Sequence, residues 1–341
     1  MQALVWTGPR QMVMRAEPDP TPESHEVLIK VAYAGICGSE LSSYLGHNAL
    51  RVPPVIMGHE FSGKIVELGS AATAYNASLA VGQAVTVNPL DYTEPCEYCE
   101  QGLHHLSPTR QLVGAHRPGA YASHVSVPAK LITPLPETMS LRIGALTEPT
   151  ACGVRIGEIA GDVSGQDCLI IGAGPIGLLA LQVLQLNGAK RIFIVDLDQE
   201  RLAMGAALGG ETLDPNALDV VEQVHKATNG RGVSVAVDAV GTAGTRTQCI
   251  SATRARGIMV LTGLHEETSA MPAADIIRRE INVRGSFAYS PANFAQALTL
   301  LDQKKIRLDP WIEDAPLADG DLWFNRLMDA PGNVSKVLLV P

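Results

Sequence analysis

The chain has 341 residues and a mass of 36.1 kDa, which is long for one domain and sufficient for two. Hydrophobic residues make up 46% of it and charged residues 18%, a balance that excludes a disordered chain. The net charge of −9, without a cluster of lysine and arginine, argues against nucleic acid or an anionic membrane as a partner.

Residues 1–147 are rich in glycine and proline, and turn residues separate the short apolar runs at 26–31, 85–89 and 121–127. This pattern predicts the short strands of an antiparallel β domain.

Residues 148–287 alternate between strand-like and helix-like segments. Strands are expected at 167–171, 191–195, 233–237 and 257–261, and helices at 175–186, 199–208, 219–228 and 242–253. This alternation predicts a doubly wound parallel sheet. Residues 288–341 add an expected helix at 291–303 and a terminal strand at 336–340, and we expect this segment to rejoin the first domain.

No segment predicts export or membrane insertion. The first residues lack the basic and the long apolar segments of a signal peptide, so we expect a cytoplasmic protein. The longest apolar run, 168–181, is interrupted by glycine and proline and is too short to span a membrane. In the cytoplasm the six cysteines are not expected to form a disulfide framework.

The segment after the strand at 167–171 carries the pattern G-x-G-x-x-G, in which Gly172, Gly174 and Gly177 enclose Pro175 and Ile176. Glycines at these positions allow a tight turn, close approach of the backbone to a pyrophosphate and close packing of a helix on a strand. The helix N-terminus adds amide donors and partial positive charge. We therefore expect these five residues to bind a dinucleotide; the alternative is a glycine-rich turn that only packs.

Asp196 stands at the end of the second expected strand, where a carboxylate can accept hydrogen bonds from ribose hydroxyls and repel the 2′-phosphate of NADP. This position predicts NAD as the cofactor. Arg201 qualifies the prediction, since a nearby arginine can hold a 2′-phosphate. Arg201 is also suitably spaced to form a surface ion pair with Asp198.

Cys37 and His59 lie in the predicted β domain, and Glu148 lies at the expected domain junction, where we expect a cleft. A thiolate, an imidazole and a carboxylate suit Zn²⁺, and three protein ligands with an open fourth position are typical of catalytic zinc. Taken singly, Cys37 can also be a small buried hydrophobe and His59 a hydrogen-bonded core residue.

The chain resembles the zinc-dependent medium-chain alcohol dehydrogenases along its whole length. The resemblance is carried by residues 36–39, 58–63 and 148–149 and by the dinucleotide pattern. The resemblance is strongest to the polyol branch, which includes sorbitol, galactitol-phosphate, butanediol and threonine dehydrogenases. It implies a GroES-like catalytic β domain, a Rossmann domain and one catalytic zinc held by Cys37 and His59. It makes Glu148 a third ligand or the residue that holds the zinc-bound water, and Glu60 an exchangeable ligand or a neighbour of the ligands.

A lobe that carries a structural zinc in some family members departs from their pattern here. Its four cysteine positions fall on Thr93, Cys96, Cys99 and Ser107. Two thiolates cannot close a tetrahedral zinc site. We therefore expect no structural zinc and two reduced, partly exposed thiols; the alternative is that His104 or His105 replaces a missing ligand.

The route of the proton also departs from many relatives, because Ser42 occupies the position of their proton-relay histidine. Ser39 matches the hydroxyl that takes the proton from the alcohol in relatives, and we expect it to pass that proton through the cofactor ribose to water. Tyr44 and His47 are candidates for the substrate pocket or ordinary surface-loop residues.

The resulting prediction is reversible, NAD-dependent oxidation of a secondary hydroxyl in a small polyol or sugar alcohol. The alternatives are a threonine-type dehydrogenase and a polyol-phosphate dehydrogenase, for which Arg51 is the candidate phosphate ligand. A zinc-free, crystallin-like nucleotide-binding protein is the alternative from another class. The resemblance also implies a homodimer or homotetramer, with a strand at 281–285 available to pair across a subunit boundary.

Overall fold

The computed structural model describes residues 1–47, 49–308, 311–329 and 332–341. The chain divides into two compact units, of which the first comprises Met1–Glu148 with Ser290–Pro341 and the second Pro149–Tyr289. The sequence places the corresponding boundaries after residues 147 and 287.

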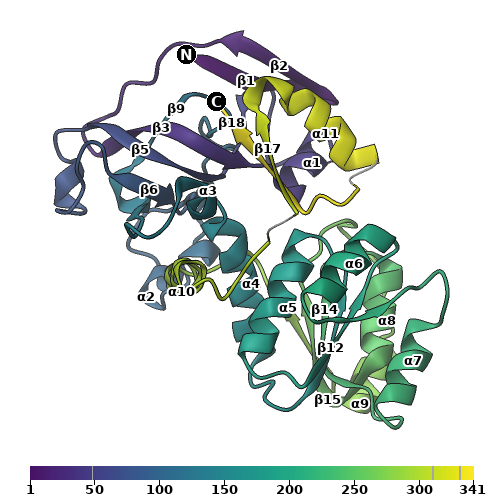
Figure 1. The fold of residues 1–341 in the computed structure, drawn as a ribbon. Helices are drawn as coiled ribbons and strands as arrows, with labels where there is room; N and C mark the ends of the chain where they lie inside the picture. The colour runs from purple at the N-terminus through teal and green to yellow at the C-terminus, as the bar shows by residue number, and fades with distance from the viewer. Residues whose placement is uncertain (48, 309–310, 330–331) are drawn as a thin grey trace. The chain divides into compact units, whose positions relative to one another are not determined.

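The first unit is built on antiparallel sheets (Figure 1). One sheet has the order β2-β1-β4, and a larger one has the order β10-β6-β5-β3-β18-β17, with β9 also pairing with β3. Only β17 and β18 pair in parallel there among the described residues, and β18 brings the C-terminus against β3, Leu338 opposite Gly35. The strands of this unit are β1 (Gln2–Gly8), β2 (Gln11–Ala16), β3 (Glu26–Gly35), β4 (Val55–Ile56), β5 (Glu60–Leu68), β6 (Ala84–Val87), β7 (Leu90–Asp91), β8 (Gln111–Leu112), β9 (His124–Pro128), β10 (Ile132–Pro134), β17 (Ile312–Pro316) and β18 (Lys336–Val340).

Helices pack around these sheets, and two aromatic contacts hold helix α1 in place. The Phe324 ring on α11 lies 5.1 Å from the ring of Tyr44 on α1 and 6.0 Å from that of Tyr121. All three rings are completely buried, so the contact anchors α1 in the core. The helices of this unit are α1 (Gly38–Tyr44), α2 (Glu97–Glu100), α3 (Leu141–Gly144), α10 (Pro291–Asp302) and α11 (Gly320–Asp329), and α4 (Thr147–Ala160) begins in it and continues into the second unit.

The second unit is a six-stranded parallel sheet in the order β13-β12-β11-β14-β15-β16, with helices on both faces (Figure 1). Buried aliphatic side chains of β11, β12 and β14 form its centre, as expected for strands covered on both faces. The elements are β11 (Asp167–Ile171), α5 (Pro175–Leu186), β12 (Arg191–Val195), α6 (Gln199–Ala207), β13 (Glu211–Leu213), α7 (Val220–Ala227), β14 (Val233–Asp238), α8 (Ala243–Ala252), β15 (Thr253–Leu261), α9 (Ala273–Arg279) and β16 (Asn282–Gly285).

The two architectures confirm the predicted fold class, an antiparallel β unit joined to a doubly wound parallel sheet. The sequence did not predict the hairpin β1–β2, strand β17 or helix α11; β17 pairs with β18, and α11 packs on α1 and β2, contacts that no local pattern records. Among the described residues, no helix combines the length and the apolar character needed to cross a bilayer.

Candidate metal centre and nucleotide site

Cys37 occupies the N-cap position of α1, with an extended backbone at φ −99° and ψ 149°. The carboxylate of Glu40, in the first turn of α1, accepts a hydrogen bond of 3.1 Å from the Cys37 amide. The Ser39 hydroxyl donates to the Cys37 sulfur over 3.5 Å. The helix start therefore holds a thiol and a hydroxyl next to each other.

His59 and Glu60 come from the neighbouring strand region. Glu60 begins β5 and lies opposite Gly35 of β3, and β3 leads directly to Cys37. Donor atoms of Cys37, His59 and Glu60 all lie within 4.8 Å of one another. The pairing of β3 with β5 thus brings together a sulfur, a nitrogen and an oxygen donor, the mixture that suits zinc.

The imidazole of His59 is oriented by Glu40, a residue that the sequence pattern had not singled out. His59 Nδ1 lies 2.8 Å from Glu40 Oε1, and the same oxygen accepts a 2.8 Å hydrogen bond from the Gly58 amide. An ionised carboxylate only accepts, so Nδ1 carries a proton, and in the neutral ring the Nε2 lone pair is the one that can bind a metal. The pattern Cys-x-x-Glu at a helix start was the signal that could have found Glu40.

The electrostatics of the site favour a cation. Burial disfavours an imidazolium, but the negative charges of Glu40 and Cys37 outweigh burial and raise the pKa of His59 well above its usual value. The half-buried thiol of Cys37 and the buried imidazole of His59 thus lie where positive charge is stabilised, which suits a divalent metal ion. The donor set and its charges therefore fit zinc.

Glu60 already has a cation of its own. Lys336 Nζ lies 2.7 and 2.8 Å from the two Glu60 oxygens and donates to the Ile36 carbonyl over 3.0 Å. Burial would lower the pKa of Lys336, but the charges of Glu60, Cys37 and Glu148 raise it. Lys336 arrives on β18 from the end of the chain, and no local pattern in the sequence indicates its partner.

Glu148 is buried, with 7% of its surface exposed, and lies in the first turn of α4. Among the described residues, the cluster of donors within 4.8 Å around Cys37 does not include it. The negative charge of Glu148 nevertheless acts on Lys336.

The lobe at residues 93–107 differs from the prediction. Cys96 and Cys99 form a disulfide instead of remaining two reduced thiols, and Cys99 is buried. The single turn of α2 places their Cα atoms 5.1 Å apart, within the range for a disulfide, and this i, i+3 proximity is the physical reason for the correction. His104 lies near this pair, and its donor, with those of Glu94 and Cys99, forms a second cluster within 4.8 Å.

The glycine-rich turn has the geometry that its pattern requires. Gly172 has φ +103°, and a Cβ on Gly177 would lie 1.8 Å from the Gly172 carbonyl oxygen. Gly174 is the N-cap of α5, with open space where a Cβ would be. Pro175 and Ile176 form the first turn of α5, where Pro175 gives up no intrahelical hydrogen bond.

Asp196 follows β12 and lies directly beside this turn. One carboxylate oxygen accepts a 2.7 Å hydrogen bond from the Ala173 amide, and the other accepts 3.0 Å from the Asp198 amide. Asp198 caps α6 by accepting from the amides of Glu200 and Arg201. Among the ion pairs of the described residues none joins Asp198 to Arg201, so the surface ion pair considered above is not formed; capping uses the carboxylate instead.

Two other expected pocket residues are in the core. Tyr44 is completely buried, and its hydroxyl lies 3.0 Å from the Asn325 side-chain oxygen and 3.3 Å from Asp321. Arg51 is also buried, with 2% exposed, and its guanidinium donates to Gly114, Ser39 and Ser43, which argues against a role as phosphate ligand. Ring packing on Phe324 holds the side chain of Tyr44 in the core, and hydrogen bonds to Gly114 and Ser43 hold that of Arg51. His47 is exposed.

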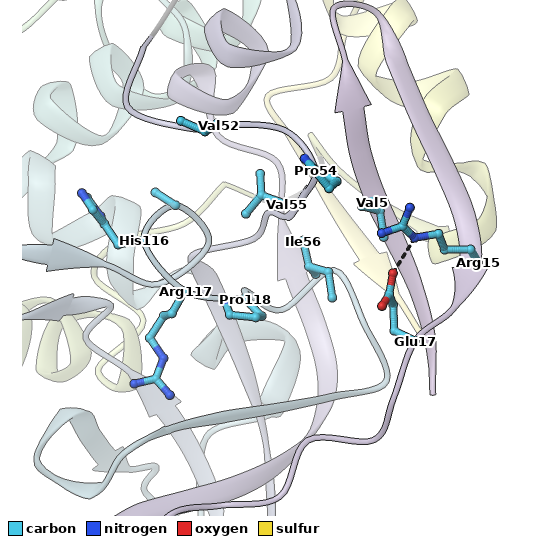
Figure 2. A pocket seen from close by; sticks show the side chains of 11 residues that line it. Val5, Arg15, Glu17, Val52, Pro54, Val55, Ile56, His116, Arg117 and Pro118 are labelled. Carbon is cyan, nitrogen blue, oxygen red and sulfur yellow. Dashed lines mark hydrogen bonds and ion pairs between the residues drawn. The ribbon is translucent and has the colours of Figure 1, made fainter.

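A pocket of about 340 Å³ opens elsewhere on the first unit and is shown in Figure 2. Arg15 in its wall pairs with Glu17, and Arg117 pairs with Glu26 and the Ser126 carbonyl. The lining includes none of the candidate site residues, and the protein itself engages these charged groups.

Comparison with known proteins places this geometry in a family. Residues 175–303 match the model of the zinc-binding dehydrogenases, and residues 23–137 match that of the alcohol dehydrogenase GroES-like domain. A sorbitol dehydrogenase of Halalkalibacterium halodurans is 33% identical over 100% of this chain and 99% of its own. The chain belongs to the zinc-dependent medium-chain alcohol dehydrogenases.

Two further relatives support the assignment to this family. A D-arabitol-phosphate dehydrogenase of Enterococcus avium is 32% identical over 94% of this chain and 91% of its own. A zinc-binding dehydrogenase structure from Sinorhizobium meliloti, bound to NADP, has a TM-score of 0.92 and 30% identity and covers 100% of this chain and 99% of its own. This medium-chain dehydrogenase is therefore a nucleotide-dependent oxidoreductase of alcohols, and nothing in these matches supports the zinc-free alternative.

Proposed function

We propose that this dehydrogenase catalyses reversible, NAD-dependent oxidation of a secondary hydroxyl in a polyol or sugar alcohol, with one zinc ion at Cys37 and His59. The observation that carries the proposal is the donor cluster of Cys37, His59 and Glu60 within 4.8 Å. The sorbitol dehydrogenase relative, matched along its whole length, supports the substrate class.

The ligands are assigned from their partners. Cys37 and His59 supply sulfur and nitrogen, while the Glu60 carboxylate is already held by Lys336. This favours Glu148 as the third ligand or the residue that holds a water, and Glu60 as an exchangeable ligand. The lobe with Cys96 and Cys99 is proposed to contain no structural zinc.

A bound zinc ion supplies a Lewis acid that makes the proton of an alcohol easier to remove. Ser39 is the hydroxyl that takes this proton, because it lies 3.5 Å from the Cys37 sulfur. We propose that the proton then passes to the cofactor ribose and to water. The turn at Gly172–Gly177 binds the pyrophosphate, and Asp196 accepts from the ribose hydroxyls, which favours NAD over NADP. Arg201 lies in the first turn of α6 and is a candidate contact to the adenosine half.

The test is metal analysis of the purified protein combined with NADH formation on a panel of sugar alcohols, diols and threonine. We expect one zinc per chain and turnover of a polyol. Cys37→Ala and His59→Ala should lose both zinc and turnover while the folded circular dichroism spectrum persists. Cys152→Ala, which alters another half-buried cysteine outside the cluster, is the matched control and should retain both. Full turnover by a zinc-free variant would refute the proposal.

A polyol phosphate is the second candidate substrate, supported by the D-arabitol-phosphate dehydrogenase relative. The burial of Arg51 and its bonds to protein groups argue against this residue as the phosphate ligand. Adding phosphorylated polyols to the panel separates the two substrates. The homo-oligomer, with β16 as its pairing edge, and the cytoplasmic location stay predictions.

A further inference from the structure

Arg51 lies next to the candidate metal ligand His59 and contacts helix α1, whose N-cap is Cys37. Its side chain has no exposed surface. Nε donates to the Gly114 carbonyl over 2.9 Å, and Nη1 donates to the Ser39 carbonyl over 3.3 Å and to the Ser43 hydroxyl over 3.2 Å. One guanidinium therefore ties α1 to the loop at residue 114.

The remaining nitrogen of Arg51 points to the residues that orient the zinc ligand. Nη2 lies 3.4 Å from His59 Nδ1 and 3.8 Å from Glu40 Oε1. Both Arg51 and the Nδ1–H of His59 are donors, so they converge on Glu40 as the shared acceptor. Glu40 completes the set by accepting from Cys37, Gly58 and Tyr121.

The charges in this region balance in pairs. Glu40 is completely buried, and an unpaired carboxylate there would be very costly. Arg51 compensates Glu40 as Lys336 compensates Glu60. With these two carboxylates paired to cations, the sulfur of Cys37 and the Nε2 atom of His59 remain available to a divalent ion.

An arginine has a property here that a lysine lacks. Its planar fork directs several donors at fixed angles, whereas an ammonium is a compact point charge on a flexible stem. The five groups around Arg51 are distributed over its three side-chain nitrogens, which a single ammonium nitrogen cannot reproduce.

We propose that Arg51 is a positioning residue that holds Ser39 and Glu40 in place and, through Glu40, sets the orientation of the His59 imidazole toward the metal. This inference rests on the proposed zinc site and adds a residue to it. Arg51 contacts neither substrate nor cofactor in this role.

The test separates the charge of Arg51 from its geometry. Arg51→Lys keeps the positive charge and loses the fork. Arg142→Lys makes the same exchange in the same unit, at a guanidinium whose Nε donates to Asp314 and whose Nη2 donates to the Ile312 carbonyl, and serves as the matched control. Each purified full-length variant is loaded with Zn²⁺ for affinity measurements against a chelating dye, and with Co²⁺ for its visible absorption spectrum, which depends on ligand geometry.

For Arg51→Lys we expect zinc affinity to fall by about 10–100-fold, the usual effect of altering a partner of a metal ligand, and the Co²⁺ spectrum to change. Arg142→Lys should match the wild type in both. Wild-type affinity and an unchanged Co²⁺ spectrum in Arg51→Lys would overturn the inference. If that variant does not fold, Ser43→Ala, which removes one guanidinium partner and keeps Arg51, decides by the same two measurements.

The wild type and Cys37→Ala are measured in the same series. A wild type that binds no zinc, or a Cys37→Ala variant that binds it normally, would overturn the zinc site itself and the inference with it. Zinc binding that depends on Cys37 but is indifferent to Arg51 would overturn only the role of Arg51.

Discussion

Replacing Glu40 by glutamine should strongly destabilise the first unit, because this carboxylate is surrounded by donors. Oε1 accepts from Gly58 and His59, and Oε2 accepts from Cys37 and Tyr121. In Glu40→Gln one of these oxygens becomes an NH₂ group that faces two donors. The shape of the side chain is kept, so the effect reports hydrogen bonding and charge instead of a cavity.

The magnitude follows from the pKa of Glu40. Burial raises this pKa, but the charge and hydrogen bond of His59, the charge of Arg51 and the hydrogen bond of Tyr121 lower it from 4.5 to about 2. At 1.36 kcal/mol per pKa unit, the ionised carboxylate stabilises the folded state by about 3 kcal/mol. Breaking a buried ion pair costs roughly 3–5 kcal/mol, in agreement.

The pH dependence has a definite sign. The pKa in the folded state is depressed, so the stabilisation is fully present above the unfolded value of 4.5 and is lost as pH falls toward about 2. Urea unfolding of metal-free wild type and Glu40→Gln at pH 7 should differ by about 3 kcal/mol in the free energy of unfolding, and this difference should shrink by about 1 kcal/mol at pH 3.5. A difference below about 1 kcal/mol at pH 7, or one that grows on acidification, would refute the reasoning.

Four further outcomes test other parts of the molecule. Lys336→Met leaves the Glu60 carboxylate buried without its cation and should lower the free energy of unfolding by roughly 3–5 kcal/mol in urea titrations; no change would contradict the pairing. Gly177→Ala places a Cβ 1.8 Å from a carbonyl oxygen and should weaken NADH binding, measured by fluorescence, and lower the melting temperature. The wild type should prefer NAD to NADP in kcat/KM, and Asp196→Ser should narrow this preference; equal use of both cofactors by the wild type would remove the argument from Asp196. Ser39→Ala should lower kcat about 10²-fold or more with zinc content unchanged, and a normal kcat would exclude the relay.

In the second unit, local sequence patterns predicted the bounds of two strands and a helix correctly. Strands β11 and β12 and helix α5 have the bounds expected from the sequence, because an apolar run between turn residues and a glycine-rich helix start are read within a few residues. The same holds for Cys37 and His59, whose motifs are local and which the structure brings together. In the first unit, β17 and α11 were not predicted, since their apolar faces are defined only by packing on β18 and α1.

From the order of residues alone, the alternating strands, the dinucleotide turn and the family of the metal donors could be inferred, because each depends on side chains close together along the chain. Only the tertiary structure decided which charges neutralise one another. Lys336 reaches Glu60 because β18 adds to β3, and Arg51 reaches Glu40 because its guanidinium also bonds Ser39 and Ser43 of α1. Partners of buried charges are selected by proximity in space, so no spacing in the sequence records them.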